Sequence, residues 1–170
     1  VRKNLNQFEL SVREEITCHN MWELQDKHWH NFSTSKPTRQ QLWWLKDIFP
    51  DDADCQFTLH NMVYIDGCIH TGDVVAFHSQ GQLRLGELLA TVGLVSETKA
   101  EMVSFVAPWG HDDSEDRRFA NCKVEHSSLR VPVSDLVTAL LHRMAGDGNS
   151  CVVYMTVELR MSLDYSVCQR

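Results

Sequence analysis

Residues 62–77 read MVYIDGCIHTGDVVAF, and this stretch decides the predicted fold. It contains short apolar runs that are separated by Asp66-Gly67 and by Gly72-Asp73. Asp-Gly between two apolar runs is a strong signal for a β-hairpin, because both turn positions favour positive φ and glycine adopts it without steric cost. The stretch therefore predicts a strand, a tight turn, a short second strand, a break and a third strand.

Apolar residues continue to alternate with a period of two on the C-terminal side of this stretch. The polar and charged segment 108–119 interrupts the alternation, and we expect it to be a long exposed loop. The predicted strands lie near residues 57–65, 68–70, 73–78, 83–93, 101–107, 122–126 and 151–160.

Two segments have the apolar spacing of helices instead. The first begins at Thr38, where Gln41 completes a capping box, and Pro50 ends it. The second lies near 134–145, where apolar residues recur at i, i+3, i+4, i+7, i+8 and i+11. These repeating residues are Val133, Leu136, Val137, Leu140, Leu141 and Met144.

The helix at Thr38 and a weaker helical pattern at 19–31 suggest a helical extension over residues 1–54, followed by a β domain over 55–170. The chain of 170 residues, 43% of them hydrophobic, is long enough to bury a core. No run of about 18 apolar residues predicts a membrane span. The six cysteines form no CxxC pair, so reduced and buried thiols are the default expectation.

The net charge of −7 is concentrated in the middle of the chain. Residues 51–117 contain 12 Asp and Glu against 3 Lys and Arg, whereas each flank is close to +1. An acidic surface repels a nucleic-acid backbone and attracts a basic partner. A solvated acidic face that maintains solubility explains the same charge equally well.

Several short segments of this chain follow one another in a familiar order. In sequence they are Val63-Tyr64-Ile65-Asp66-Gly67, Gly72-Asp73-Val74-Val75, residues 85–89, residues 102–109, residues 121–128 and Val131-Pro132-Val133. Over residues 57–162 this order resembles a bromo-adjacent homology (BAH) domain. The resemblance implies a mainly β fold, a partly open twisted barrel, on which the predicted helix 134–145 would pack. It also implies a non-enzymatic, chromatin-associated and nuclear module without a cofactor, which binds a basic peptide such as a histone tail.

Some BAH domains hold a methylated lysine in a cage of aromatic rings, whose faces attract the cation. The corresponding positions here are Phe77, Phe105 and Trp109. Phe105 stands where the family usually has Trp, Ala107 stands where it usually has Tyr, and Trp109 comes one or two residues late. The resemblance therefore implies an incomplete cage, and a ligand that is an unmodified tail or another protein.

Trp109 is followed by the carboxylates of Asp112 and Asp113, an arrangement that suits a peptide rich in Lys and Arg. The predicted peptide-binding site therefore consists of Phe77, Phe105, Trp109, Asp112 and Asp113. The competing interpretation is a solvated surface loop with one packed tryptophan.

Other classes of function have less support in the sequence. No GxSxG, HExxH, GxGxxG or GxxxxGK motif is present, so we do not expect an enzyme. The pairs His28-x-His30, Cys68-x-His70 and Cys122-x3-His126 lack the paired short spacings of a structural zinc site, so no metal is predicted. The alternative function is a protein–protein assembly domain of a larger protein, for example one derived from a mobile element. In that case Trp43 and Trp44, or the helix near 134–145, would form the contact.

Overall fold

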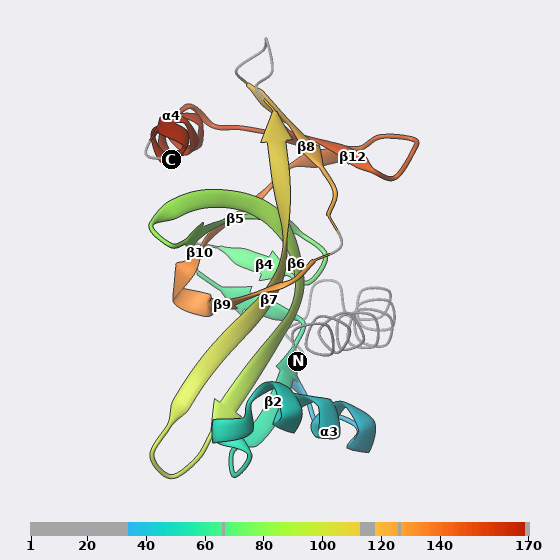
Figure 1. Ribbon diagram of the computed structural model, residues 1–170, viewed down its shortest axis with the longest axis vertical. Coiled ribbons are helices and arrows are strands. Elements are labelled where there is room, and N and C mark those ends of the chain that lie inside the picture. Colours follow the sequence, from blue (N-terminus) through green and yellow to red (C-terminus); the bar gives the residue numbers. More distant parts are fainter. Residues whose placement is uncertain (1–33, 66, 113–117, 126, 169–170) are drawn as a thin grey trace.

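The computed structural model describes residues 34–65, 67–112, 118–125 and 127–168, and the account below is confined to them. The fold is built on a long antiparallel hairpin of β6 (Gln82–Val95) and β7 (Ala100–Asp112). This hairpin runs along the long axis of the molecule (Figure 1). The register shifts between Leu88 and Ala90, so a bulge bends β6 at this position.

Each strand of the hairpin pairs with two further strands along its length. On β6, β5 (Val74–Ser79) pairs with the first half and β2 (Gln56–His60) with the second half. On β7, β9 (Leu129–Pro132) pairs near the middle and β8 (Phe119–Lys123) pairs at the C-terminal end. All these pairings are antiparallel, so the prediction of a mainly β fold is confirmed.

The remaining strands extend this sheet or stand beside it. Each further strand adds to one neighbour: β1 (Thr34–Ser35) to β2, β10 (Leu136–Leu140) to β5, β12 (Ser150–Tyr154) to β8, and β11 (His142–Met144) to β12. A separate hairpin consists of β3 (Met62–Tyr64) and β4 (Cys68–His70). Among the described residues, the 3-10 turn η3 (Val133–Asp135) joins β9 to β10 without a ladder between them, and no closed barrel forms.

The turn residues behave as their chemistry predicts. Gln80 and Gly81 have φ values of 53° and 74°, and they form the two-residue turn between β5 and β6. Gly67 has φ 126° between β3 and β4, whereas Asp66 lies outside the described residues. Gly72 has φ 91°, and its N–H donates to the carbonyl of Leu88 at 2.7 Å, which ties this break to the centre of β6.

The first predicted helix is confirmed as α3 (Arg39–Ile48). The backbone N–H of Gln41 donates to Thr38 Oγ1 at 3.2 Å, and the backbone N–H of Thr38 donates to Gln41 Oε1 at 2.9 Å. Trp44 is buried while the adjacent Trp43 is 64% exposed, since neighbouring helix residues point about 100° apart. After α3, the 3-10 turn η2 (Pro50–Asp52) leads into β2.

Three apolar clusters follow one another along the hairpin. The first joins α3 to β2 and the tip half of β6–β7, and includes Leu45, Phe57 and Phe105. The middle cluster lies under β5, β9 and β10. The third joins β8, β12 and α4 (Val157–Cys168) to the other end of the hairpin. Figure 1 shows α3 and β2 at one end of the molecule, and β8, β12 and α4 at the other.

The predicted helix near 134–145 is wrong, because this segment forms η3, β10 and β11. β10 pairs with β5, and both of its faces meet apolar clusters: Val137 and Leu140 pack on one cluster and Ala139 on another. A strand that is covered on both faces has no polar alternation, so its apolar residues also fit a helical spacing. Two residues of the supposed apolar face, Leu141 and Met144, are exposed.

The predicted strand over 151–160 is also wrong in its second half. β12 ends at Tyr154 and α4 begins at Val157. The N–H of Leu159 donates to Thr156 Oγ1 at 3.2 Å, so Thr156 is an N-cap that the alternating pattern concealed.

Other predicted boundaries shift. The strand over 57–65 divides into β2 and β3 at Asn61, and the predicted loop 108–119 is shorter, because β7 continues to Asp112 and β8 begins at Phe119. The predicted strand over 122–126 is largely replaced by β8, which ends at Lys123. The helical pattern at 19–31 lies outside the described residues. No helix in the described part of the chain is long and apolar enough to cross a membrane.

Candidate functional site

The three aromatic residues of the predicted peptide site lie inside the protein. Phe77 is 0% exposed, Trp109 is 4% exposed and Phe105 is 7% exposed. Each belongs to a different apolar cluster, so the structure does not bring the rings together. Trp109 Nε1 is buried without a hydrogen-bond partner among the described residues. In this conformation none of the three offers a ring face to a ligand at the surface.

Of the two carboxylates in that predicted site, the structure describes only Asp112. Asp112 is exposed at the C-terminal end of β7, opposite Asn121 of β8. Asp113 lies outside the described residues. The exposed Glu125 also comes close to this end of β7, because its Oε1 lies 3.4 Å from the place that a Cβ on Gly110 would take.

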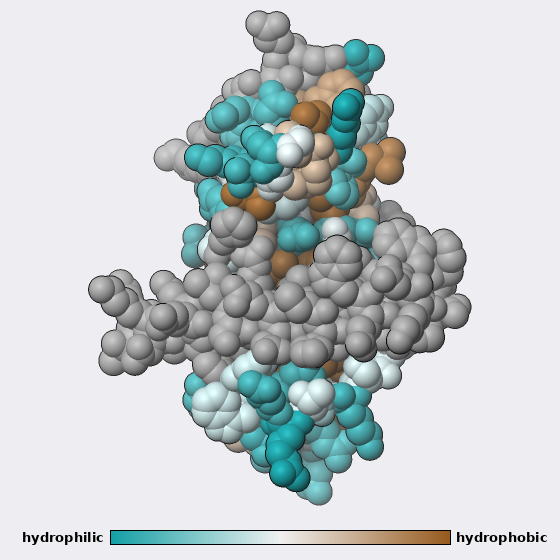
Figure 2. Space-filling model, turned by 90° about the vertical axis from the view of Figure 1, so that its right-hand side faces the viewer, coloured by the Kyte–Doolittle hydropathy of each residue, from teal (hydrophilic) through white to brown (hydrophobic). Residues whose placement is uncertain are grey.

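A second set of carboxylates gathers at the opposite end of the molecule. It comes from η2 and the residues after it, and from the β6–β7 tip, which the pairing of Gln56 with Val95 brings together. Figure 2 shows the visible face of this end, below the grey atoms, mostly in teal and white, as expected for hydrophilic residues. The acidic residues at this end are Asp51, Asp52, Asp54, Glu97 and Glu101.

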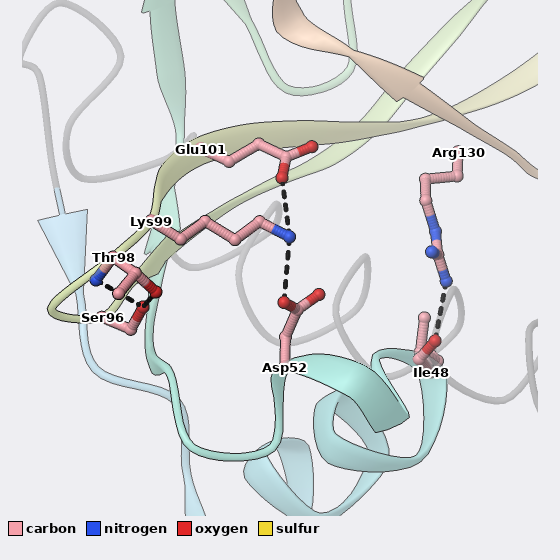
Figure 3. Close-up of polar contacts among 7 residues, drawn as sticks. All are labelled: Ile48, Asp52, Ser96, Thr98, Lys99, Glu101 and Arg130. Carbon is pink, nitrogen blue, oxygen red and sulfur yellow. Dashed lines mark hydrogen bonds and ion pairs between the residues drawn. The ribbon is translucent and has the colours of Figure 1, made fainter.

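Two of these carboxylates form ion pairs with the same lysine (Figure 3). Lys99 Nζ lies 2.9 Å from Asp52 Oδ1 and 3.0 Å from Glu101 Oε2. The hydrogen bond to Asp52, followed by that to Glu101, raises the pKa of Lys99 above its usual value. The bridge ties η2 to the β6–β7 tip, so its role is structural.

Arg130 of β9 fastens the end of α3 to the sheet (Figure 3). Its Nη2 donates to the carbonyl of Ile48 at 2.7 Å, and its guanidinium carbon lies 4.2 Å from the ring centroid of Phe49. A cation at a helix C-terminus satisfies a free carbonyl and interacts favourably with the helix dipole. The acidic end is thus held by contacts from the β6–β7 turn and from β9.

An open cavity of about 590 Å³ lies between the residues that follow η2 and the β6–β7 tip. Asp54 and Glu97 are exposed on its wall, and neither forms an ion pair with a described residue. Val95, which is 50% exposed, gives the cavity an apolar surface. The complete lining is Asp54, Gln56, Val95, Ser96, Glu97 and Thr98. This site combines two unneutralised carboxylates with a concave surface.

Sequence reasoning identified the acidic region but not this site. No local pattern connects residues 51–54 with Ser96-Glu97-Thr98. The signal that joins them is the register of β2 on β6, which sets Gln56 opposite Val95. That register depends on residues almost forty positions apart, so it was not visible in the local pattern.

Two of the described cysteines, Cys122 and Cys151, offer no reactive site. Cys122 of β8 and Cys151 of β12 are buried directly opposite each other and are not bonded. Burial raises the pKa of Cys122 to about 12, and burial also raises the pKa of Cys151. Since the thiolate is the nucleophile and the metal ligand, both thiols are inert at neutral pH. No three His, Cys, Asp or Glu side chains in the described ranges gather in a way that could hold a metal ion.

Comparisons of the chain with protein-family models, with curated proteins and with solved structures found no match.

Proposed function

We propose that the protein is a non-enzymatic, chromatin-associated interaction module of the nucleus that binds a basic peptide such as a histone tail. The observation that carries the proposal is the cavity with the free carboxylates of Asp54 and Glu97. The order of sequence segments that resembles a BAH domain supports the choice of a histone tail as the ligand. In this proposal the ligand binds at the acidic end of the molecule and not at the buried aromatics.

The cavity suits a lysine or arginine side chain on chemical grounds. The methylene groups of such a side chain can cover Val95, while the charged head stays in water near Asp54 and Glu97. The hydroxyls of Ser96 and Thr98 add hydrogen-bond acceptors at the rim. Each exposed ion pair contributes about 0.2–1 kcal/mol, so the carboxylates mainly steer and orient a basic ligand.

Binding of a fluorescein-labelled histone-tail peptide, followed by anisotropy, tests the proposal. The variant Asp54→Asn/Glu97→Gln should weaken binding severalfold and flatten its salt dependence, because it removes the two unpaired charges. The matched control Asp112→Asn/Glu125→Gln removes the same formal charge at the other end of the molecule. Equal weakening in both variants would mean that only net charge matters. Weakening in the control alone would mean that the peptide binds near Asp112.

A peptide array with methylated and unmodified forms separates recognition of a mark from general attraction. A peptide held by carboxylates alone should bind with little regard to methylation, because the methylated and unmodified lysines have the same charge. Strong preference for one methylated form would require an aromatic cage, and would show that the buried rings become accessible.

One observation favours the second candidate function, a protein–protein assembly domain. Val152 and Tyr154 are exposed on one face of β12, and the exposed Leu141 lies beside them, because its carbonyl accepts from the N–H of Tyr154. Met144 of β11 and Trp43 of α3 are exposed elsewhere. Exposed apolar residues that lie close together mark interaction sites more often than isolated ones do. Sedimentation at high salt distinguishes this function: a dimer that is lost in Leu141→Ser/Tyr154→Ser would support assembly, and a monomer at all concentrations would exclude self-assembly.

A further inference from the structure

We propose that a second cavity, beside the acidic one, binds an apolar side chain that lies next to a carboxylate in the same peptide. This inference rests on the proposed function and adds the direction in which the peptide lies across the two cavities. The cavity has a volume of about 360 Å³, and lies between α3 and β2. Its lining consists of Lys36, Pro37, Leu42, Lys46, Cys55, Gln56, Phe57 and Thr58.

The floor of this cavity is apolar and rigid. Phe57 and Cys55 belong to the first apolar cluster, and Leu42 packs against it from α3. Pro37, whose ring fixes its own φ, also lines the cavity. Small-ligand pockets are typically 300–1,000 Å³ in volume and mostly apolar, with a few polar groups that fix orientation. The cavity lies at the small end of this range and fits one aromatic or branched aliphatic side chain.

Two cations stand at the rim of the same cavity. Lys36 and Lys46 are both exposed, and neither forms an ion pair with a carboxylate of the described residues. Lys46 also lies in the last turn of α3, where the helix dipole already favours a cation. An apolar floor under two unpaired ammonium groups selects an apolar group with a carboxylate beside it, and repels a basic side chain.

The two cavities share one wall, Gln56, at the start of β2. Asp54 and Glu97 line the first of these cavities, and Lys36 and Lys46 line the second. An extended peptide that crosses Gln56 therefore meets opposite charges on the two sides. A ligand with a basic residue at one end and an apolar-acidic pair at the other would complement both cavities in one direction only.

A pair of labelled peptides tests this polarity. Both carry the same Arg-Lys pair; one continues with Phe-Glu, and the other continues with Gly-Ser, each with one to four glycines between. The best Phe-Glu peptide should bind about tenfold more tightly than its Gly-Ser partner, as expected from one buried ring and one ion pair. Lys36→Gln/Lys46→Gln should reduce this advantage by about two- to fivefold, the share of an exposed ion pair, and should not weaken the Gly-Ser peptide, which has no carboxylate to pair with either lysine. Equal binding of the two peptides, or an advantage that the lysine variant leaves undiminished, would overturn the inference.

A probe that contains no basic group tests the cavity independently of the proposed function. The aromatic anion 8-anilinonaphthalene-1-sulfonate should bind the wild type, and should slow alkylation of Cys55 by iodoacetamide in peptide-resolved mass spectrometry. The exposed Cys68 provides the internal control. Protection that is lost in Lys36→Gln/Lys46→Gln would support the cavity even if no basic peptide binds, in which case only the proposed function fails. Absence of lysine-dependent protection would overturn the inference even if basic peptides bind.

Discussion

Replacement of Trp109 by alanine separates the two possible locations of the ligand site. Trp109 lies on β7 opposite Leu85 of β6, and packs in the cluster that joins the hairpin to β8, β12 and α4. If it were a ring of an open peptide site, its loss would reduce binding and spare the fold. Since it is 4% exposed, we expect the reverse: a loss of stability, with little direct effect on peptide binding in the remaining folded protein.

The expected loss follows from two opposing terms. Truncation of a buried tryptophan removes apolar burial and leaves a cavity, which costs about 3–5 kcal/mol. The same change removes Nε1, a buried donor without a partner among the described residues, and this offsets the loss of stability by about 1 kcal/mol. The net decrease in the free energy of unfolding is therefore about 2–4 kcal/mol. For a chain of this size this corresponds to a Tm lower by roughly 4–16 °C.

Urea denaturation followed by circular dichroism measures this difference. Trp43→Ala is the matched control, because it removes the same side chain from a position that is 64% exposed, and should change stability by no more than about 0.5 kcal/mol. The reasoning would be refuted if Trp109→Ala were as stable as Trp43→Ala but no longer bound the peptide. That result would mean that the Trp109 ring is accessible to ligand.

Three further changes have defined outcomes. Gly86→Ala should destabilise the protein by several kcal/mol in urea denaturation, because its Cβ would overlap the backbone carbonyl oxygen of Ala107, whereas Gly146→Ala meets open space and should be close to neutral. Thr38→Ala removes the capping hydroxyl of α3 and should cost about 0.5–2 kcal/mol, and a Thr38→Ser variant that is equally damaged would contradict this explanation. The Cys122 thiol, whose pKa is raised from 9.0 to about 12, keeps its proton in the folded state when the unfolded chain has lost it. Its contribution to stability is therefore complete below about pH 9 and decreases as the pH rises toward 12, so Cys122→Ala should flatten the decline of Tm over this range.

The sequence predicted the candidate site only as an excess of acidic residues in the middle of the chain. The excess of Asp and Glu over residues 51–117 correctly indicated an acidic surface, but not which carboxylates remain free. Lys99 occupies Asp52 and Glu101, while Asp54 and Glu97 stay unpaired on a cavity wall. This division depends on the approach of η2 to the β6–β7 tip.

The sequence by itself determined the elements whose causes lie within a few residues of one another. The capping box at Thr38 and the hairpin around Gly67 both follow from local backbone preferences, and each was found where the pattern predicted it. Such signals are reliable because their hydrogen bonds and φ values involve neighbours in the chain.

Only the tertiary structure decided which surfaces are covered. Residues 136–140 form a strand because β5 offers them a free edge between two apolar clusters, although their spacing equally fits a helix. Phe77, Phe105 and Trp109 are buried, because residues from distant parts of the chain join each of them in an apolar cluster. Burial is a property of the assembled sheet, and a local pattern records which residues are apolar without recording what will lie against them.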